Sequence, residues 1–378
     1  MNLTDGQKHV IGVVDAFCDE HFDEQSIQQW CISRGMPTHV YDAFYESELG
    51  GYVLPISVGG KDCPFLDRVT LIMAMVRRAG ASLPIQSDMT ALALLSSMRQ
   101  VSQDEIVEDL YSKTGRVLFS QAFTEPNAGT DAAGQKTTAV DKGDYWLLNG
   151  TKIFITNAGP AEIYIVFAMT DKEKGNRGIT AFIVEKDMEG FSIGKHEEKM
   201  GIRGSATAEL VLEDVKVPKE NMLGELNKGF KIAMMTLDGG RIGIAAQALG
   251  IAEGAIKETV EYVNNRVQFV KSISQFQNTQ FELAQMAANT EAAKLLVYQA
   301  ACAKDAGEPY SHLAAMAKLV AAQNASDVTR RCLQLYGGYG YVRDYPIERM
   351  MRDAKITEIY EGTSEVQKMV IANWLGVK

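Results

Sequence analysis

The fold is decided by a stretch near the end of the chain, Arg352-Asp353-Ala354-Lys355-Ile356-Thr357-Glu358-Ile359-Tyr360-Glu361-Gly362-Thr363-Ser364-Glu365. It begins as a helical run and is predicted to break at Glu361-Gly362-Thr363, because glycine frees the backbone to turn. The Thr-Ser pair that follows suits a loop or the N-cap of a new helix. A carboxylate at such a junction can act as a base in a cleft, although most Glu-Gly-Thr runs are ordinary helix ends.

Four further motifs accompany this stretch in order along the chain. They are Phe123-Thr124-Glu125-Pro126-Asn127-Ala128-Gly129-Thr130-Asp131, Leu148-Asn149-Gly150-Thr151-Lys152-Ile153-Phe154-Ile155-Thr156-Asn157, Leu237-Asp238-Gly239-Gly240-Arg241 and Gln334-Leu335-Tyr336-Gly337-Gly338-Tyr339-Gly340. Together the five motifs resemble the signatures of the acyl-CoA dehydrogenases. The resemblance is close over residues 117 to 378 and loose over the first hundred or so.

Composition limits the classes of partner that the chain can have. The formal net charge is -10 and no block of Lys or Arg offsets it, so neither nucleic acid nor an anionic membrane is an expected partner. No apolar run is long enough to span a bilayer, and no signal or transit pattern opens the chain. The five cysteines and five histidines are scattered, which predicts reduced thiols, a cytoplasmic location and no metal site.

The first part of the chain, residues 1–115, is predicted to be an all-helical domain. Thr4 and Gln7 form a candidate capping box for the first helix. Residues 67–79 and 90–98 are further amphipathic candidates, and residues 53–60 are expected to form a loop.

The middle part, residues 116–225, changes to short β-rich runs that are separated by turn signals. The runs are 117–119, 145–148, 163–167, 179–184 and 209–212. Strands so close together, without helices between them, predict a small antiparallel β-barrel and argue against a βαβ nucleotide-binding fold. No Gly-x-Gly-x-x-Gly follows a predicted strand, which argues against a bound NAD.

The last part, residues 226–378, is predicted to be a four-helix bundle of long helices. Apolar residues recur every three or four positions in three stripes. The stripes are Ile242, Ala245, Leu249, Ala252, Ile256, Val260 and Val263; Phe281, Ala284, Ala288, Ala292, Leu295, Tyr298 and Cys302; and Leu313, Ala317, Val320, Val328, Cys332 and Leu335, with Asn324 as a polar exception. The expected fold is therefore α+β in three domains, which is also the fold that the resemblance implies.

The resemblance implies a bound FAD that two groups of residues hold. Phe123, Thr124, Gly129, Thr130, Phe154, Ile155 and Thr156 would surround the flavin ring, with Thr130 contacting FAD or the acyl-CoA. Arg266, Phe269, Gln277, Gln334, Gly337 and Gly338 would reach the FAD of a neighbouring subunit, and Thr363 and Glu365 are further cofactor candidates. Val270 and Ser272 stand where the family usually has Gly and Pro.

The resemblance also implies the substrate site and its base. Asp238, Gly239, Gly240, Arg241, Tyr360 and Gly362 would line the acyl-CoA site, together with Thr130. In two branches of the family the base sits just before the Arg of the Asp-Gly-Gly-Arg motif, but here that position is Gly240. Glu361 is therefore the expected base.

The resulting hypothesis is an FAD-dependent short-chain acyl-CoA dehydrogenase. Identities such as Ala168-Met169-Thr170-Asp171 resemble the butyryl-CoA dehydrogenases of bacteria. The implied partners are an acyl-CoA substrate, electron-transfer flavoprotein and copies of the same chain in a homotetramer, a dimer of dimers. Two alternatives remain: the same fold acting as an enoyl-CoA reductase on crotonyl-CoA or an aryl-acrylyl-CoA, and a non-enzymatic relative that uses the scaffold for binding.

Overall fold

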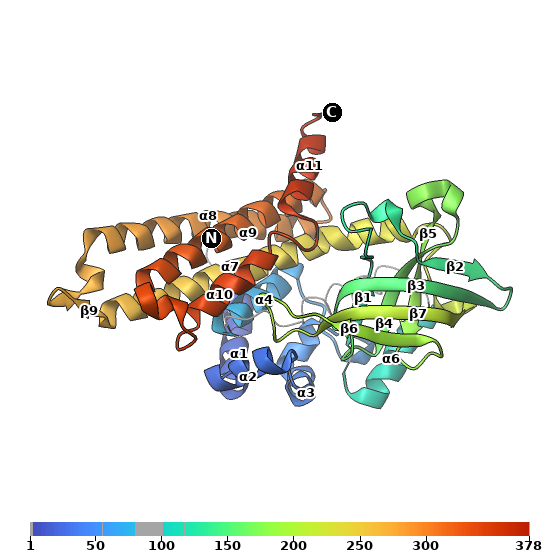
Figure 1. Cartoon of the computed structure of the whole chain (residues 1–378), viewed down its shortest axis with the longest axis horizontal. Coiled ribbons are helices and arrows are strands. Elements are labelled where there is room, and N and C mark those ends of the chain that lie inside the picture. The colour runs from blue at the N-terminus through green and yellow to red at the C-terminus, as the bar shows by residue number, and fades with distance from the viewer. Residues whose placement is uncertain (1–2, 55, 80–100, 117, 378) are drawn as a thin grey trace.

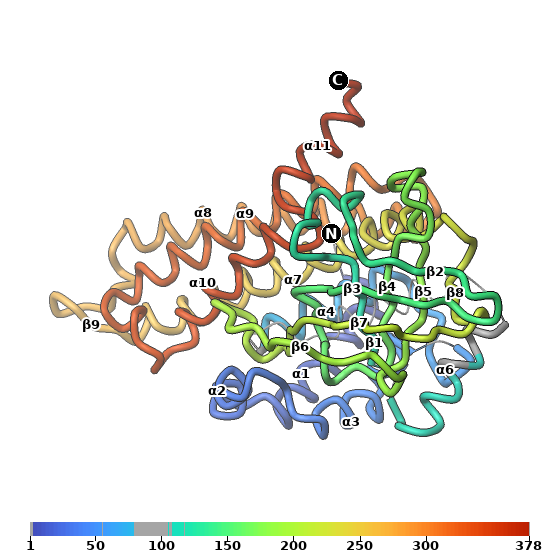
Figure 2. The backbone as a smooth tube through the Cα atoms, turned by 45° about the vertical axis from the view of Figure 1, so that its right-hand side comes forward, coloured from blue at the N-terminus to red at the C-terminus, as the bar shows by residue number. Residues whose placement is uncertain are grey.

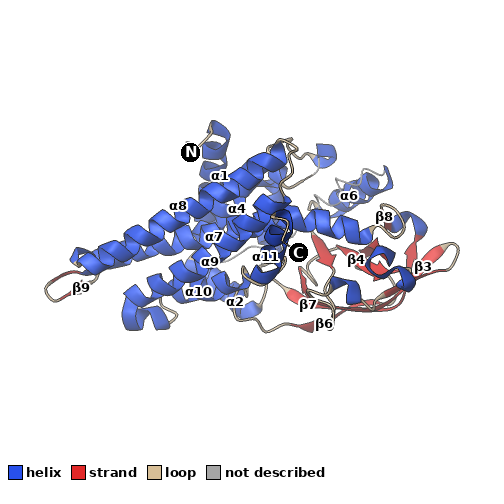
Figure 3. Cartoon of the chain, turned by 90° about the horizontal axis from the view of Figure 1, so that it is seen from above, coloured by secondary structure: helices blue, strands red, loops and turns tan. Residues whose placement is uncertain are grey.

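Helices and strands occupy different ends of an elongated molecule in the computed structural model of the chain, which describes residues 3–54, 56–79, 101–116 and 118–377. Long helices form one end and a twisted sheet the other, with the N-terminal helices below the junction (Figure 1). The same separation is visible after a turn of the view, in the backbone trace (Figure 2) and from above (Figure 3).

The described N-terminal segments are helical, as predicted. The helices are α1 (Asp5–His21), α2 (Glu24–Ser33), α3 (Thr38–Glu46), α4 (Phe65–Ala79) and α6 (Val101–Thr114). The capping box is confirmed, because Gln7 N donates to Thr4 Oγ1 and Thr4 N donates to Gln7 Oε1. The prediction of a plain loop over 53–60 was incomplete, since short 3-10 turns run over Glu48–Tyr52 and Ile56–Val58. The helix predicted over 90–98 lies outside the described residues.

The middle of the chain folds into one eight-stranded sheet and not into the expected antiparallel barrel. Its strands are β1 (Phe119–Ala122), β2 (Thr138–Asp141), β3 (Tyr145–Thr156), β4 (Ile163–Met169), β5 (Ile179–Glu185), β6 (Phe191–His196), β7 (Thr207–Pro218) and β8 (Met222–Leu223). The pairing order β6-β7-β3-β2-β4-β5-β8 leaves β6 and β8 at the two ends, so the described strands do not close into a barrel.

The strand directions also correct the prediction, because β4 pairs in parallel with both β1 and β2. Every residue of β4 is buried, as is typical of a strand covered on both faces. Strands β2 and β6 were not predicted, since they are short and mostly exposed and therefore carry little apolar alternation.

The C-terminal part is helical, and its first helices are much longer than its last two. The helices are α7 (Gly229–Asn265), α8 (Gln277–Asp305), α9 (Ser311–Tyr336), α10 (Ile347–Ile356) and α11 (Ser364–Trp374), with a small hairpin of β9 (Val267–Gln268) and β10 (Lys271–Ser272) at the far end. Helix α4 approaches α7 closely at Gly250, where an added Cβ would lie 2.6 Å from the Met73 carbonyl oxygen. Glycine is required there because any side chain would push the two helices apart.

The apolar stripe predicted on α8 is mostly on its exposed face, which is a correction. Phe281 and Leu295 are 63% and 48% exposed, whereas Met286 and Val297 are fully buried. The helix therefore has apolar residues on two faces, one inside this chain and one directed to solvent. Sequence periodicity alone does not distinguish the face that packs within the chain from a face that is free for another chain.

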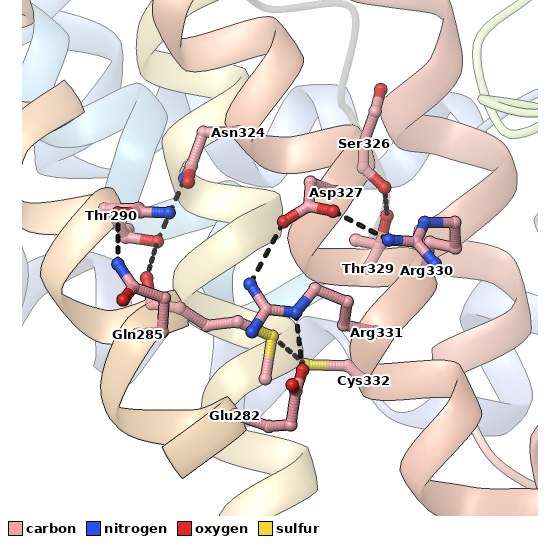
Figure 4. A network of polar contacts seen from close by, with 12 residues as sticks. Glu282, Gln285, Thr290, Asn324, Ser326, Asp327, Thr329, Arg330, Arg331 and Cys332 are labelled. Atoms are coloured by element: carbon pink, nitrogen blue, oxygen red, sulfur yellow. Dashed lines mark hydrogen bonds and ion pairs between the residues drawn. The ribbon is translucent and has the colours of Figure 1, made fainter.

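Polar contacts tie α8 to α9 and explain the polar exception on the α9 stripe (Figure 4). Asn324 is buried, and its Nδ2 donates to Thr290 Oγ1 of α8 at 3.0 Å. Arg331 Nε donates to Glu282 Oε2 at 2.7 Å across the same interface. Buried polar groups are costly unless they are paired, so the contact between Asn324 and Thr290 helps to fix the register of the two helices.

Within the described residues, no helix is both long and apolar enough to cross a membrane. The same residues contain no cluster of His, Cys, Asp or Glu that would suit a metal ion.

Candidate active site

The predicted helix break exists, but it begins earlier than the sequence suggested. Helix α10 ends at Ile356, and residues 357–363 form a tight connection before α11. Glu361 has φ 53° and Gly362 has φ 87°, so two successive residues lie in the left-handed region. This conformation is strained for a glutamate, and such strain is commonly retained where it positions a functional group.

The connection ends in a capped helix, as predicted. Thr363 is the N-cap of α11, and its Oγ1 accepts from Val366 N at 3.4 Å. Its hydroxyl oxygen therefore has a structural use within the chain, and Glu365 lies exposed in the first turn of α11.

The Glu361 carboxyl has the properties that a general base needs. Its Oε2 is shielded from solvent and has no hydrogen-bond partner among the described residues. Burial raises the pKa of this carboxyl from 4.5 to about 7, while the charges of Arg241 and Lys318 oppose that rise. A carboxyl with a pKa near neutrality can accept a proton from carbon at physiological pH.

Of the substrate residues predicted on α7, Gly240 and Arg241 lie at this carboxyl, whereas Gly239 faces the Lys304 side chain. A Cβ built at Gly240 would lie 2.7 Å from Glu361 Oε2, so the missing side chain leaves room for the carboxylate. Arg241 is buried and donates to Asp238 Oδ1 at 2.5 Å, and Ser311 donates to the same oxygen. The motif at 238–241 and the motif at 361 therefore meet in space.

Tyr360, a predicted substrate residue directly before the base, is bonded to helix α7. Its hydroxyl donates to Gln247 Oε1 of α7, and burial raises its pKa well above 10. Tyr360 is thus a neutral hydrogen-bond donor that ties the connection to α7.

The predicted flavin residues of the sheet also gather at one place. The Thr124 carbonyl accepts from Ile153 N at 2.9 Å, which joins the loop after β1 to the end of β3. Phe123 packs edge-on against Phe167 at 5.0 Å between ring centroids. Gly129 and Thr130 are exposed further along the same loop.

Phe154 is the most unusual of these residues, because it combines a left-handed backbone with an exposed aromatic ring. The β3–β7 register shifts between Lys152 and Ile155, and Phe154 has φ 57° with its side chain 60% exposed. Ile155 is buried and Thr156 is half-buried at the strand end. An aromatic ring turned outward by a strained bulge gives an apolar platform of the kind on which a flavin ring could lie.

Sequence reasoning missed a buried ion pair beneath this loop. Lys152 is fully buried, and its Nζ donates to Glu125 Oε1 at 2.7 Å, to Gln135 Oε1 at 3.0 Å and to the Phe123 carbonyl at 3.2 Å. Glu125 in turn accepts from the backbone N–H groups of residues 136 and 137. One signal could have found the pair: Trp146, Leu148 and Lys152 share the inward alternation of β3.

The second predicted cofactor group lies elsewhere, at the far end of the helices. Arg266, Gln334, Gly337 and Gly338 line one surface hollow of about 620 Å³. The guanidinium of Arg266 lies over the ring of Tyr339, at 5.2 Å from its centroid. Gln277 begins α8 close by, and Phe269 is 86% exposed on the hairpin loop.

This hollow is too distant to share a ligand with Glu361 of the same chain. Arg266 follows Gly240 by 26 residues along α7, which at ~1.5 Å per residue separates the two by roughly 39 Å. One FAD molecule cannot extend from the base to this hollow. The two groups of predicted cofactor residues therefore belong to different places in one chain.

The sheet part and the C-terminal helical part of the chain each match a family of known proteins. Residues 120–215 match the family profile of the acyl-CoA dehydrogenase middle domain, and residues 227–376 match that of the acyl-CoA dehydrogenase C-terminal domain. The chain is 60% identical over 258 residues to a short-chain specific acyl-CoA dehydrogenase of Clostridium acetobutylicum, covering 68% of each protein. It is 41% identical to the caffeyl-CoA reductase-Etf complex subunit CarC of Acetobacterium woodii, covering 99% of each.

A solved structure agrees with these relatives. The chain superimposes on butyryl-CoA dehydrogenase from Megasphaera elsdenii with a TM-score of 0.94 and 46% identity, covering 99% of both chains. The fold and the matches define a flavin-dependent oxidoreductase with FAD as its cofactor. The chain belongs to the acyl-CoA dehydrogenase family, which confirms the family resemblance, the enzyme class and the cofactor that the motifs predicted.

Proposed function

We propose that the chain dehydrogenates short-chain acyl-CoA thioesters to trans-2-enoyl-CoA, with Glu361 as the base. The observation that carries the proposal is the Glu361 carboxyl itself, shielded, without a hydrogen-bond partner and raised to a pKa of about 7 beside Gly240. The 60% identical relative named as short-chain specific supports the substrate class.

In this mechanism the protein positions the thioester and moves one proton. Glu361 accepts the α-proton, and its backbone N–H is proposed to hold the thioester carbonyl while negative charge develops on it. The missing side chain at Gly240 lets the carboxyl approach, and Tyr360 fixes the connection to α7 through Gln247. The bound FAD supplies the acceptor for the β-hydride. Phe154, Ile155 and Thr156 are proposed to lie against the ring, and Phe123, Thr124, Gly129 and Thr130 to lie along it.

We further propose that FAD is shared between subunits of a homotetramer. Roughly 39 Å of helix separates Arg266 from the base, so the hollow near Arg266 would hold the cofactor of a partner. The exposed apolar face of α8, with Phe281 and Leu295, supports association with another copy of the chain. We also propose that the three-part division at residues 1–115, 116–225 and 226–378 marks the domains.

Replacing Arg266 with alanine is expected to lower FAD retention. A guanidinium gives strong, charge-assisted bonds to phosphate oxygens, and the variant loses them. The measurement is the ratio of flavin to protein absorbance after gel filtration. Arg330→Ala is the matched control, because Arg330 is exposed and pairs with Asp327 on its own helix. Full retention of FAD in Arg266→Ala would show that this residue does not hold the cofactor.

Butyryl-CoA is expected to bleach the flavin much faster than dodecanoyl-CoA. The prediction follows from the identity to the short-chain relatives and is checked with a panel of acyl-CoA thioesters from C3 to C12, including aryl-acyl thioesters. Equal rates for the C4 and C12 thioesters would contradict the short-chain assignment.

A second candidate is the reverse reaction on an enoyl-CoA. It is favoured by the reductase named among the relatives, which is similar over nearly the whole chain. In the forward reaction electrons would pass to electron-transfer flavoprotein, and in the reverse reaction they would come from it. Comparing turnover with oxidised and with reduced electron-transfer flavoprotein decides between the two directions.

A further inference from the structure

A second buried cation besides Arg241 lies beside the base, and the proposed mechanism gives it no role. Lys318 is fully buried in α9, and its Nζ donates to the Gly362 carbonyl at 2.5 Å. A lysine is rarely buried without an acidic partner in direct contact, because desolvating an ammonium group is costly. Here its direct bond is to a neutral carbonyl oxygen.

The Gly362 carbonyl is held from two sides. Gln367 Nε2, also fully buried, donates to the same oxygen at 2.7 Å and to the Glu361 carbonyl at 3.3 Å. The two donors come from different helices, α9 and α11. They bond the backbone of Glu361 and Gly362, the two residues with left-handed backbone conformation. Together they fix the direction in which the Glu361 side chain leaves the backbone.

The two cations beside the base have different partners of their own. Arg241 from α7 and Lys318 from α9 both act on Glu361. Arg241 is the stronger of the two influences on Glu361 and is also paired with the carboxylate of Asp238. The charged groups that act on the Lys318 ammonium are Glu361, Arg241, Glu358 and Glu365, and Glu361 has the largest effect of the four.

We propose that Lys318 is a positioning residue for the reaction: it holds the Glu361–Gly362 turn through the Gly362 carbonyl, and its charge keeps Glu361 ionised enough to act as a base. The inference rests on the proposed function of Glu361. Burial lowers the pKa of Lys318 to about 8, which still leaves the ammonium group charged at neutral pH. Gln367 also holds the turn but carries no charge. Variants of the two residues can therefore separate the effect of holding the turn from the effect of the charge.

The test compares Lys318→Met, Lys318→Arg and Gln367→Met, each purified with FAD. The protonated carboxyl of Glu361 is titrated by infrared difference spectroscopy, using Glu361→Gln as the blank. Lys318→Met is expected to move the titration upward by about one pH unit or more, since an opposite charge nearby shifts a carboxyl by about 1–3 units. Lys318→Arg, which keeps the charge, is expected to titrate close to wild type.

Rates of flavin reduction by butyryl-CoA provide the second measurement. Lys318→Met is expected to be slowed by about fivefold or more at pH 7 and to recover as the pH rises, because a one-unit shift lowers the ionised fraction by that factor. Gln367→Met is expected to have a lower maximal rate at high pH, while the Glu361 carboxyl titrates at the same pH as in wild type.

Two results would overturn the proposal. One is a wild-type titration in Lys318→Met, and the other is an equal shift in Lys318→Met and Gln367→Met, which would assign the effect to distortion of the turn. If Lys318→Met does not fold, Lys318→Gln lacks the charge and is expected to show the same upward shift. Because the titration needs no substrate, its outcome is independent of whether Glu361 is the base, which the Glu361→Gln rate decides.

Discussion

The variant Glu361→Gln is expected to fold and bind FAD but to reduce its flavin with butyryl-CoA at least about 100-fold, and up to 10,000-fold, more slowly than wild type. The amide keeps the shape of the side chain and the backbone N–H but cannot accept the α-proton. Stopped-flow absorbance of the bound flavin measures the rate. Glu220→Gln, a change at an exposed glutamate in the short turn between β7 and β8, is the control and should behave as wild type.

The pH dependence of the same reaction has a defined sign. Because the carboxyl must be ionised and its pKa is about 7, the rate in wild type should rise as pH increases through 7 and level off above it. Near-normal reduction in Glu361→Gln, or a rate that falls across this range, would place the base elsewhere.

Stability provides an independent check on the buried carboxyl. Its folded pKa is raised above the ordinary 4.5, so the folded state disfavours the charged form. The stability that the neutral carboxyl contributes is complete below about pH 4.5 and is lost as pH rises through about 7. Glu361→Gln should therefore gain in melting temperature relative to wild type at pH 8, with little difference at pH 5.

The candidate site was reached from the sequence through motifs that resemble those of the acyl-CoA dehydrogenases, and the roles of its residues stay predictions. The structure does bring Gly240 and Glu361 together, and it makes Thr363 the N-cap of α11. The exact end of α10 did not follow, since it depends on contacts outside the helix, such as Ser364 N donating to the Glu358 carbonyl and Lys318 Nζ donating to the Gly362 carbonyl. Local helix propensity continues through Thr357 and does not register these contacts.

The form of the sheet was less predictable than the positions of its longer strands. Alternation and β-rich composition located β3, β4, β5 and β7, but the parallel pairing of β4 with β1 and β2 depends on long-range register. The close spacing of the strands suggested that each would pair antiparallel with the next and that together they would close a barrel. Instead, β1 pairs in parallel with β4, and the chain forms β2 and β3 between these two strands. Likewise, the stripe on α8 is a true apolar pattern, but it lies mostly on the exposed face of the helix.

Breaking the buried ion pair between Lys152 and Glu125 is expected to have a large effect on the stability of the fold. Lys152→Met is expected to lower the free energy of unfolding by about 3–5 kcal/mol, because removing one partner leaves the other charge buried and unpaired. Chemical denaturation at pH 7 measures it. Lys216→Met is the matched control, since Lys216 is an exposed lysine of the neighbouring strand β7 and should change stability by less than about 0.5 kcal/mol.

The pH dependence separates this mechanism from a simple loss of packing. Burial alone would raise the pKa of Glu125, but the charge and hydrogen bond of Lys152 outweigh it and hold that pKa below its usual value of 4.5. Ionised Glu125 therefore stabilises the fold above about pH 4.5, and this contribution is lost as pH falls through the lowered folded value. Burial acts in the opposite sense on its partner, because it lowers the pKa of Lys152 to about 8. The deficit of Lys152→Met should be largest at neutral pH and shrink toward pH 4, where Glu125 is neutral in the variant.

The same substitution should loosen the loop that is proposed to meet the flavin, because Lys152 also bonds the Phe123 carbonyl. Adding Glu125→Gln to Lys152→Met is expected to recover part of the stability, since the neutral amide costs less to bury than an unpaired carboxylate. A deficit that is the same at every pH, with no recovery in the double variant, would mean that the lysine contributes only its hydrocarbon chain. In that case the ion pair would not be what holds the loop beneath Phe123 and Thr124 in place.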